Sequence, residues 1–335
     1  MTKPRILLVA TGGTIASAED GNGLTPQLTG EQLAGYVPQA AELADIDIVQ
    51  PMNIDSTNMR PADWQAIGDA ILAQYEDYDG FVVLHGTDTM AYTAAALSYL
   101  IQDSPRPIVL TGSQQPMGSP FTDARINLYQ SVLYATDPDS HDVAVVFGGK
   151  VVAGTRARKQ RTMSFNAFTS VNYPELALIR NDRIIRTAPA GSGDARAASE
   201  PRVYHDLDER VFVLKLTPEV NPSVFELLRR DYDAIILETF GVGGIPDTLH
   251  DAIFGWVDSG RTLVVTTQVP EEGLDLGVYE VGRAYAEHPG ILKGADMTCE
   301  ALVAKTMWVL GPTRESERLR ELFYRPVNCD RLPEA

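Results

Sequence analysis

The chain has 335 residues, of which 44% are apolar and 22% charged, so it has the composition of a globular protein long enough for two domains. Its formal net charge of −17 argues against a nucleic-acid partner, because a phosphate-binding surface needs Lys and Arg concentrated on one face. Its two cysteines, Cys299 and Cys329, exclude a disulfide framework and fit a reducing compartment.

The N-terminus leads directly into a short apolar run, Ile6–Ala10, which predicts a buried first strand. The run is too short for the apolar core of a secretory signal, and no small-residue cleavage site follows it. No stretch of the chain approaches the ~20 apolar residues that are needed to cross a bilayer. We therefore expect a cytoplasmic protein that does not associate with a membrane.

Apolar runs of strand length then alternate with helical patterns. Beginning near Pro61, apolar and aromatic residues from Trp64 to Tyr78 recur at spacings of three and four, which predicts an amphipathic helix. The order of strand, helix and strand predicts a mainly parallel sheet that is covered on both faces. Further strands are expected at Gly80–His85, Ile108–Thr111 and Val143–Phe147, and further helices at Met90–Ile101 and Asp123–Ala135.

The segment Thr187–Pro201 is rich in Ala, Gly, Ser and Pro, which is typical of an exposed linker. We therefore expect an N-terminal α/β domain over residues 1–186, a linker over 187–206 and a smaller C-terminal α/β domain over 207–335. In the last of these, strands are expected at Val211–Leu216, Ala234–Leu237 and Leu263–Thr267, and helices at Pro222–Arg229, Thr298–Leu310 and Arg314–Phe323.

Polar clusters follow three of the predicted strands of the first domain. They are Thr11–Thr14, His85–Thr89 and Thr111–Gln115. In open α/β sheets, ligands bind beyond the carboxyl ends of the strands, which is where these clusters are expected to lie. The sequence therefore predicts a binding or catalytic site formed by loops of the first domain.

The first cluster contains two glycines followed by Thr14. Paired glycines allow a sharp turn and a close approach of backbone N–H groups to a ligand, with the hydroxyl of Thr14 at the lip of that turn. A turn that only ends the strand is the plainer interpretation. A phosphate-binding loop is the third, but the sequence has neither GxGxxG nor a terminal Gly-Lys-Ser/Thr.

The second cluster places the hydroxyl of Thr87 beside the carboxylate of Asp88. A threonine hydroxyl is a poor nucleophile until a base removes its proton. Asp88 could orient that base, bind a cationic substrate group or cap the helix that begins near Met90. The base could be His85 or Lys159, although a histidine at a strand end is commonly structural and a lysine in an arginine-rich stretch is commonly solvated.

Several other chemistries lack their sequence signature. The five histidines show neither HExxH nor another metal-binding spacing, and there is no G-x-S-x-G nucleophile motif. Each cysteine is isolated in the sequence. We therefore expect neither a metal site nor a serine or cysteine nucleophile.

Two segments resemble the signature motifs of bacterial-type L-asparaginases: Thr11-Gly-Gly-Thr-Ile-Ala and Gly80-Phe-Val-Val-Leu-His-Gly-Thr-Asp-Thr-Met90. The pair is highly specific, and the spacing between the two segments is also similar. The resemblance covers nearly the whole chain, including Met52–Met59, Leu110–Gln114 and Phe240–Gly244. It is closest to the cytoplasmic (type I) branch.

The resemblance implies an amidohydrolase that converts L-asparagine to L-aspartate and ammonia through a threonine nucleophile and a β-aspartyl ester, with neither metal nor cofactor. Thr14 matches the nucleophile, and a second triad matches Thr87, Asp88 and Lys159. Asp88 also matches the carboxylate that holds the substrate ammonium. The other substrate-binding positions implied are Ser56 for the α-carboxylate, the neighbouring Thr57, and Ser113 for the carboxamide.

Four positions, Leu24, Thr57, Glu238 and Val269, depart from the family pattern. Leu24 stands where the family has a tyrosine on a mobile loop, so proton transfer from the nucleophile must involve Lys159, Thr25 or water. Some type I enzymes bind asparagine at a regulatory site through an arginine and a cysteine, but the matching positions here are Glu238 and Val269. We therefore do not expect that regulation.

The resemblance also implies a large flavodoxin-like domain, a smaller α/β domain, and a homodimer or homotetramer. A neighbouring C-terminal domain would approach each active site, with Asp275 and Glu280 as candidate contributors. The alternatives are a glutaminase-asparaginase, the asparaginase-like subunit of a tRNA-dependent amidotransferase, and a catalytically silent amino-acid sensor. Thr57, which replaces a glutamine of exported enzymes, favours asparagine over glutamine as substrate.

Overall fold

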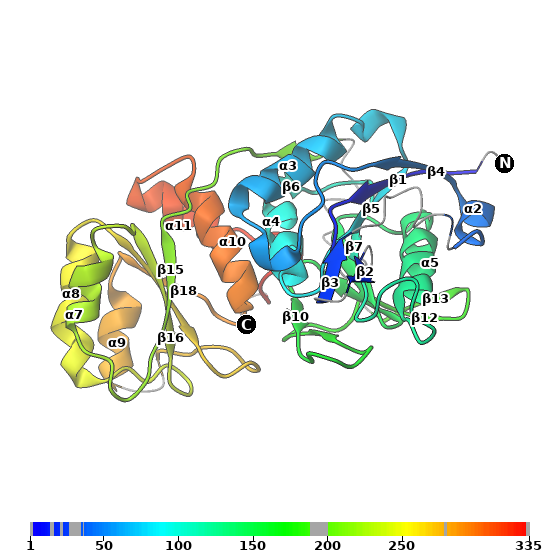
Figure 1. The fold of residues 1–335 in the computed structure, drawn as a ribbon. Helices are drawn as coiled ribbons and strands as arrows, with labels where there is room; N and C mark the ends of the chain where they lie inside the picture. Colours follow the sequence, from blue (N-terminus) through cyan, green and yellow to red (C-terminus); the bar gives the residue numbers. More distant parts are fainter. Residues whose placement is uncertain are drawn as a thin grey trace. The chain divides into compact units, whose positions relative to one another are not determined.

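The computed structural model describes residues 3–13, 17–20, 23–26, 35, 37–187, 200–277 and 280–332. The chain divides into two compact units (Figure 1). The first contains Met1–His205 together with the short late segment Val327–Cys329, and the second contains Asp206–Pro326 and Asp330–Ala335. The expected boundaries at 186 and 206 stay predictions, but Thr187 still bonds to the first unit, where its N–H donates to the carbonyl of Leu176 (3.1 Å).

The first unit is built on an eight-stranded sheet in the order β13-β12-β9-β8-β7-β5-β1-β4. Its five strands from β8 to β4 are parallel, and β9, β12 and β13 extend it as antiparallel strands. The bounds are β1 Arg5–Ala10, β4 Asp45–Val49, β5 Gly80–Leu84, β7 Ile108–Thr111, β8 Val143–Phe147, β9 Lys150–Ala153, β12 Ala177–Arg180 and β13 Arg183–Arg186. The strands predicted from apolar runs are all present.

Helices cover both faces of this sheet, as the parallel topology requires. Helices α2 (Ala40–Leu43) and α5 (Ala124–Ala135) pack on one face, against alternate strand residues such as Ile6 and Leu8. Helices α3 (Pro61–Leu72) and α4 (Met90–Leu100) pack on the other face (Figure 1). Because both faces are buried, the strands read as continuous apolar runs instead of alternating ones.

Two details of the predicted helices were wrong. Helix α3 ends at Leu72, and Tyr75 lies in the 3₁₀ turn η3 (Tyr75–Asp77). The rings of Tyr75 and Tyr78 instead pack on Phe81, at centroid distances of 5.5 and 6.4 Å, so their helix-like spacing reflects burial against the strand. Ile101 is not the end of a helix but begins the short strand β6 (Ile101–Gln102).

The first unit also contains three short antiparallel pairs of strands. These strands are too short to be recognised in the sequence as apolar runs. Strand β6 pairs with β14 (Arg202–Val203), which lies within the predicted linker. Strand β10 (Ala157–Lys159) pairs with β11 (Phe168–Ser170), and β2 (Ser17–Asp20) pairs with β3 (Gly23–Pro26). The β10–β11 pair carries Lys159.

The second unit is a smaller layered α/β unit, so the predicted fold class is confirmed. Its sheet has four parallel strands: β15 Val211–Lys215, β16 Ala234–Thr239, β17 Thr262–Thr267 and β18 Ile291–Lys293. Helices α7 (Ser223–Leu228), α8 (His250–Asp258) and α9 (Glu280–Glu287) pack on one face. Helix α10 (Cys299–Leu310) packs against β15 and β16, with α11 (Ser316–Tyr324) beside it.

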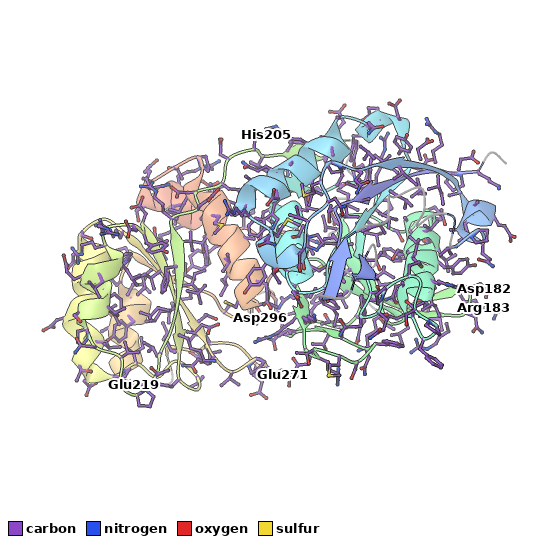
Figure 2. The ribbon with its side chains drawn as sticks, in the orientation of Figure 1. Asp182, Arg183, His205, Glu219, Glu271 and Asp296 are labelled. Atoms are coloured by element: carbon purple, nitrogen blue, oxygen red, sulfur yellow. The ribbon has the colours of Figure 1, made fainter. Side chains whose placement is uncertain are left out.

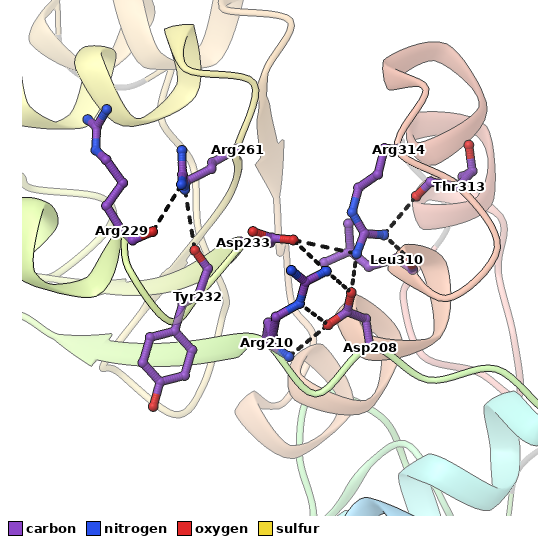
Figure 3. A network of polar contacts seen from close by, with 9 residues as sticks. All are labelled: Asp208, Arg210, Arg229, Tyr232, Asp233, Arg261, Leu310, Thr313 and Arg314. Atoms are coloured by element: carbon purple, nitrogen blue, oxygen red, sulfur yellow. Dashed lines mark hydrogen bonds and ion pairs between the residues drawn. The ribbon is translucent and has the colours of Figure 1, made fainter.

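Charged contacts fix the ends of several elements of the second unit (Figure 3). Arg210, just before β15, pairs with Asp208 (2.9 Å) and with Asp233 (2.8 Å), which precedes β16. Arg314, just before α11, pairs with the same two carboxylates. Elsewhere acidic side chains such as Glu219 and Glu271 are exposed, in keeping with the high negative charge (Figure 2).

A buried ion pair lies in the core of the second unit. Lys305 of α10 and Asp330 are both 0% exposed, and the Lys305 Nζ lies 2.5 Å from Asp330 Oδ2. The ammonium also donates to the carbonyl of Arg325 (2.8 Å). Burial, outweighing the attraction of Asp330, lowers the pKa of Lys305 to about 8.

Candidate active site

The loops after β1, β4 and β5 are joined by backbone hydrogen bonds at the carboxyl end of the first sheet. The N–H of Thr11 donates to the carbonyl of Leu84 (3.0 Å), and its hydroxyl donates to the same oxygen (2.8 Å). The N–H of Gly13 donates to the carbonyl of Ile54 (3.1 Å). Two of the polar clusters singled out in the sequence, and the segment after β4, therefore lie together.

The glycines of these loops permit a contact between two backbones. Gly13 has φ +81°, and a Cβ on it would lie 2.3 Å from the backbone nitrogen of Gly86. A Cβ on Gly86 would in turn lie 2.5 Å from the hydroxyl oxygen of Ser56. No side chain fits at either position. Thr14, which follows Gly13 in the chain, lies outside the described residues.

Strand β10 brings Lys159 to the second polar cluster. The Lys159 Nζ donates to the hydroxyl oxygen of Thr87 (2.8 Å) and to Asp88 Oδ1 (2.6 Å). The lysine side chain is only 17% exposed, whereas that of Asp88 is 57% exposed. Lys159 is therefore not a solvated surface lysine, and one carboxylate beside it is open to solvent.

The hydroxyl of Thr87 has a defined orientation. Because Lys159 donates to its oxygen, its own hydrogen is directed to Gln114 Oε1 (3.2 Å). The amide nitrogen of Gln114 donates to the carbonyl of Ser164 (3.3 Å). Our sequence reasoning did not single out Gln114, although it lies within the Thr111–Gln115 cluster.

Two buried polar residues at the start of α5 hold the loop that carries Gln114. The carboxylate of Asp123 accepts hydrogen bonds from the backbone N–H of Gln114 (3.0 Å) and of Gln115 (3.1 Å). The side-chain amide of Asn127 donates to the carbonyl of Gly112 (3.0 Å). Neither residue was singled out from the sequence. The available signal is an acidic and an amide side chain four residues apart on an apolar helix.

The predicted substrate-binding residues differ in exposure. Ser56 is buried and adjoins Gly86, and its carbonyl accepts a hydrogen bond from the hydroxyl of Thr89 (2.7 Å). Thr57 is exposed, in the middle of the 3₁₀ turn η2 (Ser56–Asn58). The buried hydroxyl of Ser113 donates to the carbonyl of Gln115 (2.6 Å), which leaves its backbone as the group that could contact a ligand.

His85 is a structural residue. It is 0% exposed, with Nδ1 lying 2.7 Å from the carbonyl oxygen of Gly86 and Nε2 lying 2.9 Å from the hydroxyl of Thr93. Burial lowers the pKa of His85 to about 4, so the ring is neutral near pH 7. Of the two candidate bases considered from the sequence, it is Lys159 that contacts Thr87.

The low pKa of His85 predicts a pH-dependent stability. The unfolded chain, with a histidine pKa near 6.5, binds this proton below pH 6.5, but the folded protein binds it only below about pH 4. The stability that depends on a neutral His85 is therefore fully present above pH 6.5. It is lost as the pH falls towards 4, because the unfolded chain then binds a proton that the folded protein does not. Between pH 7 and pH 5, the unfolding free energy of the wild type should fall by about 2 kcal/mol more than that of His85→Gln. Urea unfolding of both proteins at the two pH values measures this, and equal losses would contradict it.

The other residues considered from the sequence belong to other parts of the chain. Leu24 and Thr25 are in β3, whose side chains lie outside the described part of the chain. Glu238, Val269, Asp275 and Glu280 belong to the second unit. Among the described residues, no three His, Cys, Asp or Glu side chains are grouped to hold a metal ion, and no helix has the length and apolarity to cross a membrane.

Comparison with known proteins adds to this geometry. Residues 5–190 match the family model described as "Asparaginase, N-terminal", and residues 210–323 match "Glutaminase/Asparaginase C-terminal domain". The chain is 38% identical over 330 residues to an L-asparaginase of Thermococcus kodakarensis, covering 96% of this chain and 98% of that protein. The solved structure of the thermostable L-asparaginase from that organism superposes with a TM-score of 0.88 at 36% identity and covers 98% of this chain and 100% of its own.

Two further relatives represent different members of the family. L-asparaginase 1 of Escherichia coli is 34% identical over 349 residues, with all of both chains covered. One of the subunits of the glutamyl-tRNA(Gln) amidotransferase of Aeropyrum pernix is 36% identical over 333 residues, which covers 96% of this chain and 78% of that protein.

Proposed function

The chain belongs to the asparaginase family, and from this membership we propose that it hydrolyses L-asparagine to L-aspartate and ammonia at the site described above. The observation that carries the proposal is the contact of a largely buried lysine with both a threonine hydroxyl and a half-exposed carboxylate, between Lys159, Thr87 and Asp88. Thr87 and Asp88 follow β5, at the carboxyl end of a parallel strand, where α/β proteins bind ligands. The enzyme is an amidohydrolase.

The exposure of Asp88 and the position of Ser56 support their assignment to substrate binding. One oxygen of Asp88 accepts a hydrogen bond from Lys159, and its side chain is still 57% exposed, so the carboxylate can also bind the α-ammonium of asparagine. Ser56 lies against Gly86, beside Thr87 in the chain, and is assigned to the α-carboxylate. Thr57 and the backbone of Ser113 complete the proposed set.

Thr14 is the proposed nucleophile. It follows Gly13, which contacts Gly86, and Gly86 precedes Thr87, so the two threonines come from loops whose backbones touch. The Thr14 oxygen attacks the carboxamide carbon, the C–N bond breaks, and the nitrogen leaves as ammonia after gaining a proton. Water then attacks the β-aspartyl ester, which releases L-aspartate and restores the hydroxyl.

Lys159 and Thr87 can move the proton in the step that uses water. Their hydrogen bond is 2.8 Å long, within the range for direct proton transfer between groups. Backbone N–H groups of the glycine-containing loops would stabilise the negative charge on the carbonyl oxygen, and one such donor typically lowers the barrier by ~3 kcal/mol. Because Leu24 has no hydroxyl, the phenol found in this place in other family members takes no part.

Substrate preference tests the proposed function. We expect kcat/KM for L-asparagine to exceed that for L-glutamine by ~100-fold or more, because one additional methylene costs 1–3 kcal/mol and also misplaces the amide. Ammonia release from the purified protein with each amino acid measures this. Comparable values would indicate a glutaminase-asparaginase. Binding of asparagine in calorimetry without ammonia release would indicate a sensor.

The amidotransferase relative makes a second test necessary. A subunit of an amidotransferase works together with other subunits, whereas a free-standing asparaginase turns over without a partner of another kind. Steady turnover of asparagine by the purified chain alone would support the free-standing enzyme.

We also propose that the enzyme acts in the cytoplasm as a homodimer or homotetramer, because its motifs resemble those of the cytoplasmic branch. Analytical ultracentrifugation of the purified protein tests the oligomeric state.

A further inference from the structure

We propose that Asn328 is a positioning residue for this reaction, and that it acts by fixing strand β10 against helix α4. Asn328 lies in the segment Val327–Cys329, which belongs to the first unit although it follows the main part of the second unit in the chain. We call this three-residue segment the return segment. The inference rests on the proposed function, because its effect is exerted through Lys159.

The return segment holds the two residues that precede β10. The hydroxyl of Thr155 donates to the backbone carbonyl of Asn328 (2.6 Å), and Nε of Arg156 donates to that of Cys329 (2.5 Å). Thr155 and Arg156 are 0% exposed, so water does not compete for these hydrogen bonds. Strand β10, which ends at Lys159, therefore starts from a position that the return segment determines.

The same segment also holds helix α4. The side-chain amide of Asn328 donates to the hydroxyl of Ser98 in α4 (2.9 Å) and to the carbonyl of Val143 in β8 (2.8 Å). Helix α4 begins at Met90, two residues after Asp88. One asparagine thus bonds through its side chain to the helix that follows Thr87 and Asp88, and through its backbone to the turn that leads to Lys159.

The turn before β10 also packs directly against helix α4. A Cβ on Gly154 would lie 2.6 Å from the hydroxyl oxygen of Ser98 and 2.9 Å from the carbonyl oxygen of Ala94, both in α4. The turn before β10 is therefore already as close to α4 as a glycine allows. A displacement of either element would change the 2.8 Å and 2.6 Å contacts that Lys159 makes with Thr87 and Asp88.

The backbone of the return segment supports a specific role for an asparagine. Asn328 has φ +44° and Cys329 has φ +63°, so two consecutive residues other than glycine are left-handed. Such a conformation persists only where surrounding contacts enforce it, and asparagine tolerates it better than most residues. The hydrogen bonds to Thr155, Arg156, Ser98 and Val143 are these contacts.

A double-mutant cycle separates positioning from general stability. Thr155→Val removes the hydroxyl that bonds to Asn328 without changing the shape of the side chain, and Thr155→Ser keeps that hydroxyl. We expect Thr155→Val to lower kcat for asparagine by roughly 10-fold or more with KM changed less than about two-fold, because small displacements of a catalytic group are costly. Thr155→Ser should stay close to the wild type.

The second arm of the cycle repeats both substitutions in a Lys159→Met background. If Thr155 acts through Lys159, Thr155→Val should cause no further loss of the residual rate there, although its effect on Tm persists. An equal fold-loss in both backgrounds would mean that Thr155→Val only reduces the folded fraction, and would overturn the inference. Full activity of Thr155→Val in the wild-type background would overturn it as well.

A second variant keeps the test decisive if Thr155→Val does not fold. Asn328→Gly keeps the left-handed backbone accessible and the backbone carbonyl in place while removing the side chain with its amide, and it should give the same pattern in both backgrounds. Loss of the proposed function is recognisable separately. If Lys159→Met alone leaves ammonia release unchanged, the assignment of the site is wrong, whatever the Thr155 and Asn328 variants do.

Discussion

Replacing Thr14 by alanine should reduce ammonia release from L-asparagine by roughly 10³-fold or more, because the reaction then has no oxygen nucleophile to form the ester. The fold should tolerate the change, since threonine and alanine differ only by a hydroxyl and a methyl group. Steady-state ammonia release and the melting temperature, measured on the same preparation, separate loss of chemistry from loss of structure.

Thr14→Ser is the matched control, because it keeps the hydroxyl and removes only the methyl group. We expect it to retain measurable activity and to form an intermediate that can be trapped by rapid acid quench and detected by mass as an ester. Near wild-type turnover by Thr14→Ala would exclude Thr14 as the nucleophile and would leave attack by Thr87, or by water that Thr87 positions, as the mechanism.

Replacing Lys305 by methionine should lower the free energy of unfolding by about 3–5 kcal/mol, because it leaves the carboxylate of Asp330 buried without its cation. Both side chains are 0% exposed, and their charged atoms lie 2.5 Å apart. The ammonium also lies over the ring of Phe323, 5.7 Å from its centroid, so one substitution removes several contacts. Equilibrium unfolding in urea measures the loss.

The double variant Lys305→Met with Asp330→Asn is the control for this interpretation. Neutralising the carboxylate removes the buried charge, so the double variant should be more stable than Lys305→Met alone. A loss below about 1 kcal/mol for the single variant would show that the pair is hydrated in solution and contributes little.

The sequence predicted those elements whose signal lies within a short window. The buried strands β1, β5, β7 and β8 are continuous apolar runs, and α4, α5 and α10 have helical spacing, so their limits were close to those observed. The antiparallel strands β9, β12 and β13 were missed. Each has only four residues and begins or ends with a lysine or an arginine, so its apolar run is too short to stand out.

For the site, too, the sequence predicts only what a short window of residues reveals. That Thr87 and Asp88 follow a strand could be inferred from the residues, but the choice between His85 and Lys159 could not. That choice depends on which side chain is enclosed and which one reaches the hydroxyl, and the contact between Lys159 and Thr87 joins residues 72 positions apart. The contact of Thr155 with Asn328 spans 173 positions, and no local pattern reports it.

The return segment also has a consequence for the topology of the second unit. Since Val327–Cys329 belongs to the first unit, the stretch Asp206–Pro326 is an insertion whose two ends are both anchored. If it unfolds while the first unit stays folded, its roughly 120 residues form a closed loop instead of a free tail. Closing a loop of this size lowers the conformational entropy of the unfolded chain by an amount equivalent to about 4–5 kcal/mol. Partial unfolding of the insertion is therefore opposed by chain connectivity alone.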